Sequence, residues 1–204
     1  MRTSCLKAIL VAGALAVPVH GAHADPAALG IGLASALILG AGVAGEAWSE
    51  GDIGLNVQQE LSSFVLGAGL YDVITDNEGS DRAGLGRVEF RFGSNDWYLR
   101  PVLGAEATTD SSFYLYGGFI VDVYLWDNFV LSPNAAVGYY DKGDARDLGS
   151  ELEFRTGIEA AYRFDNGMRL GAVFHHISNA GIGDTNPGIE TLTLNFTIPI
   201  NVSE

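Results

Sequence analysis

The reactive side chains of this chain gather in one short stretch near its C-terminal end. The stretch reads His175-His176-Ile177-Ser178-Asn179-Ala180-Gly181, and Glu190 follows twelve residues after Ser178. A serine becomes a nucleophile when a neighbouring base takes its proton, and that base needs an acidic group to orient it. Serine, histidine and glutamate together can therefore supply the three roles of an acyl-ester hydrolase.

Alternation with a period of two, from residue 63 onward, predicts the elements that must carry this stretch. Successive side chains of a strand point to opposite faces, so this period is the period of a β-strand. Turn-rich pieces such as Asp165-Asn166-Gly167 separate the alternating segments, and Asn-Gly is a strong hairpin signal. Most segments are about 9–12 residues long, which suits tilted strands that cross a bilayer. The eight expected strands span 63–73, 83–93, 97–108, 112–125, 128–140, 150–164, 167–178 and 190–200.

The second and sixth segments show what each face of the sheet carries, because large apolar residues alternate there with charged ones. A soluble lipocalin-like barrel would also alternate, with its apolar face inside. Here the charges of both signs form a compact set, while every strand carries large apolar groups on its other face. We therefore expect paired charges inside and lipid outside. The residues expected inside are Arg87, Glu89, Arg91, Glu153, Arg155 and Glu159, and those outside include Val88, Phe90, Phe92, Leu152, Phe154 and Ile158.

These patterns predict an all-β fold: an eight-stranded antiparallel transmembrane β-barrel of the outer membrane. Eight strands enclose an interior that side chains fill, so no aqueous pore is expected. Aromatic residues near strand ends fit the belts found at membrane interfaces. They are Trp97, Tyr98, Trp126, Tyr139 and Tyr140.

Composition excludes several other classes of function. The formal net charge is −14, which argues against nucleic-acid binding because phosphates require clustered lysine and arginine. The single cysteine excludes a disulfide framework and a multi-cysteine metal site. His175 and His176 point to opposite faces of a strand and cannot easily hold one ion, so no metal or cofactor is expected.

The N-terminal part predicts export. Residues 1–24 combine a positive start, an apolar middle and Ala22-His23-Ala24 at the end, which is the pattern of a secretory signal peptide. Residues 25–62 form a lead-in and linker before the barrel. Within it, 27–45 is almost wholly apolar and rich in glycine. It is long enough to span a bilayer as a helix, but its glycines make it a poor helix former. The sequence leaves open whether 27–45 is a flexible lead-in, a periplasmic segment or an extended signal region.

Strand parity directs His176, Ser178 and Glu190 to the lipid-facing side. His176 and Ser178 lie two residues apart on one strand, and Glu190 has the parity of the apolar residues that follow it. Polar groups in that position are costly unless they are paired and used. An even number of strands leaves both termini in the periplasm, so the seventh strand ends at the outer leaflet. His175 has the opposite parity, and we expect it to be a hydrogen-bonded interior histidine.

The stretch 175–190 resembles the outer-membrane lipid A 3-O-deacylase (PagL) family in its pattern His176-x-Ser178-Asn179-Ala180-Gly181, with Glu190 twelve residues after the serine. The eight-strand organisation is also similar to that family over most of the mature chain. The resemblance implies a Ser-His-Glu esterase that removes the 3-position acyl chain of lipid A in lipopolysaccharide. It implies that Ser178 is the nucleophile, His176 the general base and acid, and Glu190 the residue that orients His176. Candidates for stabilising the oxyanion are Asn179, Ala180, Gly181 and Asn186.

A second hypothesis is a non-catalytic small barrel with a structural or adhesive role in the outer membrane. The outward triad discriminates between the two, since a structural barrel has no reason to direct a histidine and a glutamate toward lipid. A homodimer is compatible with the sequence, but the pattern does not define the oligomeric state.

Overall fold

The computed structural model describes residues 53–55, 60–74, 82–94, 99–125 and 128–200. The predicted signal peptide (1–24) and the apolar segment 27–45 lie outside the described residues. In the ranges that are described, no helix has the length and apolar character needed to cross a membrane. The strands are β1 (Ile53–Leu55), β2 (Ser63–Tyr71), β3 (Ala83–Arg91), β4 (Leu99–Thr108), β5 (Phe113–Val121), β6 (Val123–Leu125), β7 (Phe129–Asp141), β8 (Leu152–Arg163), β9 (Arg169–Ser178) and β10 (Ile189–Pro199).

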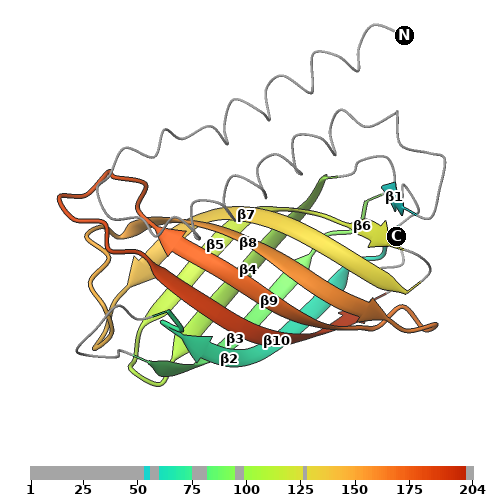
Figure 1. The fold of residues 1–204 in the computed structure, drawn as a ribbon, viewed down its shortest axis with the longest axis horizontal. Coiled ribbons are helices and arrows are strands. Elements are labelled where there is room, and N and C mark those ends of the chain that lie inside the picture. Colours follow the sequence, from blue (N-terminus) through green and yellow to red (C-terminus); the bar gives the residue numbers. More distant parts are fainter. Residues whose placement is uncertain (1–52, 56–59, 75–81, 95–98, 126–127, 201–204) are drawn as a thin grey trace, which may run out of the picture.

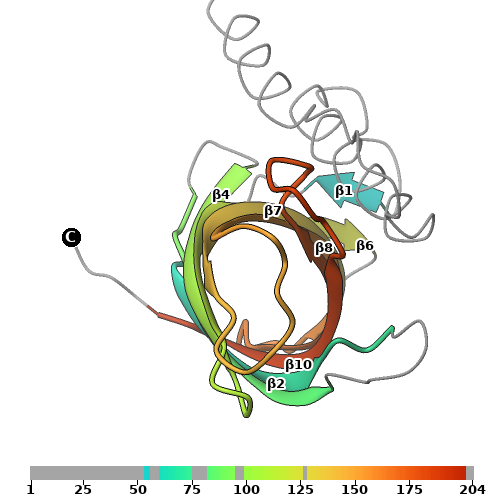
Figure 2. The same cartoon turned by 90° about the vertical axis from the view of Figure 1, so that its left-hand side faces the viewer.

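Eight long strands close into an antiparallel barrel (Figures 1 and 2). β2, β3, β4, β5, β7, β8, β9 and β10 each pair with the next in this order, and β10 pairs with β2 to close the ring. The predicted fold class is confirmed, and seven of the eight predicted strands begin and end within two residues of the observed ones, the exception being 112–125. The Asn166-Gly167 hairpin joins β8 to β9, with Gly167 in the left-handed conformation (φ 80°) that the turn requires.

The predicted strand 112–125 is interrupted at Asp122, which divides it into β5 and β6. Pairing with β7 keeps one register across the gap, since Ile120 lies opposite Asn134 and Val123 lies opposite Leu131. In this register Ser132 falls opposite Asp122, and its hydroxyl donates to Asp122 Oδ1 at 2.6 Å. Pro133, which has no N–H to donate, falls opposite Val121 at the end of β5. The short β1, which lies within the predicted linker, pairs with the free side of β6.

Burial confirms the predicted direction of the two faces. Leu194 is 65% exposed, Leu103 55% and Val88 53%, and all three are on the outer surface of the barrel. A lipocalin-like barrel would bury these side chains, so this arrangement excludes it and suits contact with hydrocarbon. The residues predicted to lie inside, Arg87, Glu89, Arg91, Glu153, Arg155 and Glu159, are all buried.

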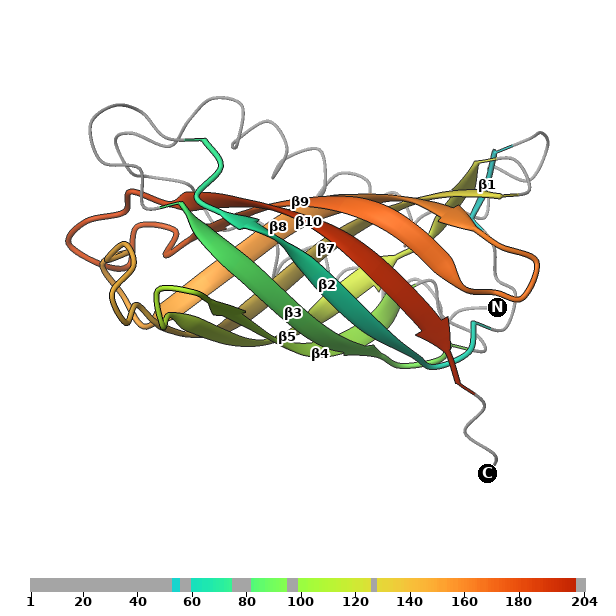
Figure 3. The same cartoon turned by 90° about the horizontal axis from the view of Figure 1, so that it is seen from below.

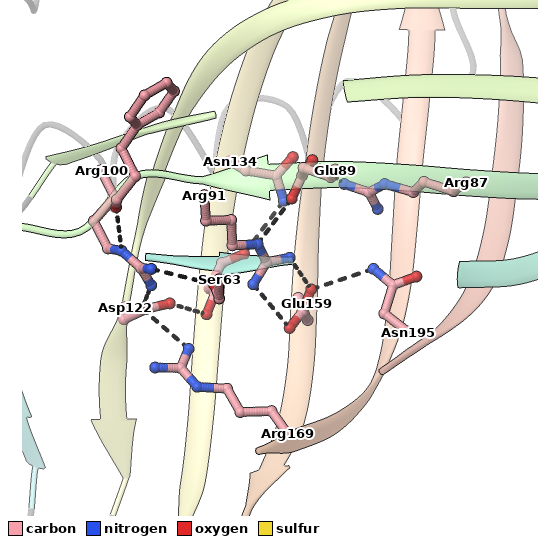
Figure 4. Close-up of polar contacts among 12 residues, drawn as sticks. Ser63, Arg87, Glu89, Arg91, Arg100, Asp122, Asn134, Glu159, Arg169 and Asn195 are labelled. Carbon is pink, nitrogen blue, oxygen red and sulfur yellow. Dashed lines mark hydrogen bonds and ion pairs between the residues drawn. The ribbon is translucent and has the colours of Figure 1, made fainter. Parts of the chain in front are cut away.

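Arginines and glutamates pair across the middle of the barrel (Figure 4). Arg91 Nε lies 2.8 Å from Glu89 Oε1, and Arg91 Nη2 lies 2.6 Å from Glu159 Oε2. Arg155 Nη1 lies 2.6 Å from Glu106 Oε1. β3 and β8 are not neighbours in the sheet, so the Arg91–Glu159 pair connects strands on different sides of the barrel. Removing one partner of such a buried pair costs more than the pair itself contributes, because the other charge is left unpaired.

A second charged cluster fills the end of the barrel where the C-terminal strand finishes. Asp122 accepts from Arg100 at 2.7 Å and from Ser132 at 2.6 Å, and Arg169 lies 3.0 Å from it. Arg169 also lies 3.0 Å from Glu60, which belongs to the predicted linker. Asp122, which separates β5 from β6, is thus the centre of this cluster (Figure 4).

The opposite end of the barrel carries the longer connections (Figures 1 and 3). The β7–β8 connection crosses the barrel opening (Figure 2) and inserts Leu148, which is fully buried against Tyr71 and Ile177 among others. The expectation that Tyr140 joins an outer aromatic belt is wrong. Its side chain faces inward and its hydroxyl lies 2.6 Å from that of Tyr71, whereas Tyr139 is exposed. Trp97, Tyr98 and Trp126 lie outside the described residues.

Replacing Arg91 should destabilise the barrel strongly. Arg91→Leu leaves Glu159 buried without its ion-pair partner, and we expect a loss of about 3–5 kcal/mol in the free energy of unfolding. Val88→Leu, on the outer face of the same strand, is the matched control and should change it by no more than about 0.5 kcal/mol. Urea unfolding in lipid vesicles measures both, and an unchanged midpoint for Arg91→Leu would contradict the importance assigned to the pair.

Candidate active site at the β9–β10 hairpin

Pairing of β9 with β10 brings an imidazole and a carboxylate together on the outer surface. Glu190 lies directly opposite His176 in the register, and His176 Nδ1 lies 2.8 Å from Glu190 Oε1. Ile177 and Ile189, the next register pair, both point inward and are fully buried. They anchor the two strands at the position where the polar pair must face outward. The carboxylate accepts the bond, so the Nδ1–H donates and Nε2 is left to accept a proton.

Ser178 is the last residue of β9 and lies on the same face as His176. It is partly exposed and lies opposite Phe154 of β8 in the register. Within the ranges that the structure describes, its hydroxyl forms no hydrogen bond with His176. Contacts between a nucleophile and its base are often long until a substrate binds. The structure thus joins two of the three predicted residues by a hydrogen bond and puts the third on the same face.

His175 lies inside the barrel, as its parity predicts. It is fully buried, and its Nε2 lies 3.1 Å from Asn134 Oδ1 of β7. Its ring packs closely against Gly157 of β8, where an added Cβ would lie 2.1 Å from the histidine Cδ2. The two adjacent histidines therefore occupy opposite sides of the barrel wall, and only His176 can reach an external substrate.

Asn179 ties two outer connections together. Its Nδ2 donates to the carbonyl oxygens of Leu148 and Thr185, both at 2.7 Å, and its Oδ1 accepts from the backbone N–H of Gly181 at 2.8 Å. Leu148 belongs to the β7–β8 connection and Thr185 to the β9–β10 connection. Asn179 thus holds the β7–β8 connection, which crosses the barrel opening, against the β9–β10 connection that follows Ser178.

Of the four residues predicted to stabilise an oxyanion, two have their N–H donors engaged in these hydrogen bonds and two do not. The backbone N–H of Asn179 donates to Asn186 Oδ1 at 3.1 Å, and the N–H of Gly181 is engaged with the Asn179 side chain. In the described part of the chain, no protein group accepts from the N–H of Ala180 or from Nδ2 of Asn186. Ala180 has a positive φ of 55°, so the chain turns sharply just after Ser178. Two of the four candidates therefore keep a donor that a ligand can use.

Leu148 was not identified from the sequence as part of the site, although it supports the loop through Asn179. The signal was present, since Leu148 is a single large apolar residue within the polar segment 141–151. Its hydrogen bond with Asn179, across the barrel end, could not be predicted from a strand pattern. Among the described residues, no group of three or more His, Cys, Asp or Glu side chains is arranged to hold a metal ion.

The sequence model described as lipid A 3-O-deacylase (PagL) matches residues 42–199. The protein named lipid A deacylase PagL from Pseudomonas aeruginosa is 44% identical over 55 residues, which are 27% of this chain and 32% of that protein. The match thus spans about a third of that relative's length.

Two solved structures share the fold. The crystal structure of the outer membrane enzyme PagL superposes with a TM-score of 0.55 and 21% identity, covering 68% of this chain and 99% of that one. A de novo designed transmembrane β-barrel gives a TM-score of 0.51 and 11% identity, covering 70% and 98%.

Removing the side chain of Asn179 should release the outer loops without unfolding the barrel. Asn179→Ala deprives two carbonyl oxygens of their donor, which costs about 1–3 kcal/mol where such groups are buried. Trypsin should then cut more quickly after Lys142 and Arg146 in the β7–β8 connection. Asn166→Ala, in the hairpin at the other barrel end, is the matched control. Equal cleavage rates for wild type and Asn179→Ala would show that the hydrogen bonds of Asn179 do not hold these connections in place.

Proposed function

Since the chain belongs to the lipid A 3-O-deacylase (PagL) family, we propose that it hydrolyses the 3-position acyl ester of lipid A in the outer membrane. The observation that carries the proposal is the hydrogen bond between His176 and Glu190 on the outer surface of paired strands. A polar pair on that surface is costly for a barrel that only spans the membrane. The alternative of a purely structural barrel leaves this pair, and the serine beside it, without a purpose.

In this mechanism, Ser178 attacks the ester carbonyl while Nε2 of His176 takes the hydroxyl proton. Glu190 holds the Nδ1–H and stabilises the imidazolium that forms. The tetrahedral intermediate collapses with transfer of that proton to the sugar oxygen, which leaves as an alcohol, and the acyl chain remains on the serine. A water molecule, deprotonated by His176, then attacks the acyl-enzyme. Collapse of the second intermediate releases the fatty acid and restores the serine hydroxyl.

Two donors suit the negative charge that develops on the carbonyl oxygen. The backbone N–H of Ala180 lies two residues beyond the nucleophile, and Asn186 Nδ2 belongs to the segment that is bonded to Asn179. Donors that are fixed in advance stabilise an oxyanion without having to reorganise during the reaction. Asn179 would contribute indirectly, by fixing the turn that carries the Ala180 amide.

The location of the hairpin fits an ester of a membrane lipid. In the proposed orientation the start of β2 and the end of β10 face the periplasm, so β9 and β10 meet at the outer leaflet, where lipid A lies. The outer surface below the hairpin is apolar, with Leu192 and Leu194 exposed on β10. An acyl chain can therefore lie against the barrel while its ester is held at Ser178.

The two histidines provide the sharpest test of these roles. Ser178→Ala and His176→Ala should each reduce deacylation by several orders of magnitude, because the members of a triad act as a unit. Glu190→Ala should cost less, since it orients the base and does not react. Mass spectrometry of lipid A after incubation with each variant in lipopolysaccharide-containing vesicles measures the loss of the 3-position acyl chain.

His175→Ala is the matched control for His176→Ala. It removes an interior hydrogen bond to Asn134 and should lower the yield of folded barrel while leaving the activity per folded molecule largely intact. Heat-dependent migration on gels reports the folded fraction. If a folded His175→Ala barrel were inactive while His176→Ala remained active, the assignment of the base would be wrong.

A further inference from the structure

Gly188, which ends the connection between β9 and β10, lies beside the His176 ring. Gly188 is buried, with a positive φ of 63°. A Cβ built on this residue would lie only 2.9 Å from Cε1 of His176 and 3.5 Å from its Nε2. The backbone of residue 188 therefore packs against the edge of the imidazole that lies next to the reactive nitrogen.

One hydrogen bond alone does not define the position of an imidazole. The bond from Nδ1 to Glu190 fixes one edge of the ring, but the side chain can still swing about that contact. The reactive Nε2 then moves relative to Ser178. A second contact on the Cε1 side removes this freedom, and Gly188 supplies it.

Contacts on both sides of Gly188 hold the segment that carries it. Asn186 Oδ1 accepts from the backbone N–H of Asn179 at 3.1 Å, which holds the start of the segment beside the end of β9. Pro187 has a fixed φ. Ile189, which follows Gly188, is fully buried inside the barrel. Residue 188 is therefore held between two anchored neighbours.

We propose that Gly188 is a positioning residue for the reaction: its backbone forms a wall against the imidazole of His176 and keeps Nε2 directed at Ser178, and only a residue without a side chain fits there. This inference rests on the proposed function. It predicts that a methyl group at position 188 displaces the ring, because neither the anchored backbone nor the strand beneath it can give way. A displacement of about 1 Å from productive geometry can cost about 100-fold in rate.

The test is Gly188→Ala in the full-length protein, assayed on purified lipopolysaccharide in vesicles. We expect kcat to fall about 100-fold with KM within a few-fold of wild type, since the wall acts on the base and not on the bound lipid. The Nδ1–H proton resonance of His176 should shift or broaden, because the bond to Glu190 is disturbed.

Gly167→Ala is the matched control. Gly167 also has a positive φ, of 80°, but lies in the hairpin at the other end of the barrel, and an added Cβ would make ordinary contact with Pro199 at 3.4 Å. This variant carries the backbone strain of a left-handed alanine without any contact with His176. It should keep the kcat and the His176 resonance of wild type.

The outcomes separate this inference from the proposed function. If Ser178→Ala retains deacylation, the proposed function fails. If Ser178→Ala is inactive while a folded Gly188→Ala barrel keeps its kcat and its His176 resonance, the proposed function stands and the role of Gly188 is overturned. Should Gly188→Ala not fold, Pro187→Gly decides the question. It loosens the wall without adding atoms and should lower kcat several-fold, whereas an unchanged kcat would overturn the inference.

Discussion

Closure of the sheet into a barrel gives every strand residue one of two environments, and the rest of the structure follows from that constraint. One face is enclosed and carries paired charges, and the other is apolar and exposed. A polar side chain on the outer face must find its partner on a neighbouring strand at the same height. His176 and Glu190 meet this condition, because the β9–β10 register sets them opposite each other.

The buried charges make that register dependable. Arg91 and Glu159 join β3 to β8 through the interior, and Asp122 with Arg169 links the β5–β6 interruption to the start of β9. A one-residue slip of any strand would exchange its two faces, and would move charges into lipid. The same ion pairs that stabilise the barrel thus fix the height at which the site residues emerge. The strands thus position His176 and Glu190, and the β9–β10 connection adds the contacts around them through Asn179, Asn186 and Gly188.

Strand number, strand bounds and the direction of each face could be predicted from the sequence, because alternation is local and the interior and exterior impose opposite chemistry. The outward His176 and inward His175 followed from parity alone. Features that depend on contacts between distant segments could not be read in this way. Asp122 separates β5 from β6 where it gathers Arg100, Ser132 and Arg169 around it. The carbonyl of Leu148, which closes the barrel end, is held by Asn179, and Gly188 is recognised only from its closeness to the His176 ring.

Covalent trapping can identify the nucleophile of the folded barrel. The p-nitrophenyl ester of a long-chain alkyl phosphonate should react with the folded barrel in vesicles, so that the serine oxygen bonds to phosphorus and p-nitrophenolate leaves. Peptide mass spectrometry should locate the adduct on Ser178. His176→Ala should abolish the reaction, while Thr156→Ala, which alters the β8 residue opposite His176, should preserve it. An adduct on a different residue, or equal labelling of wild type and His176→Ala, would contradict the account of an outward serine activated by the His176–Glu190 pair.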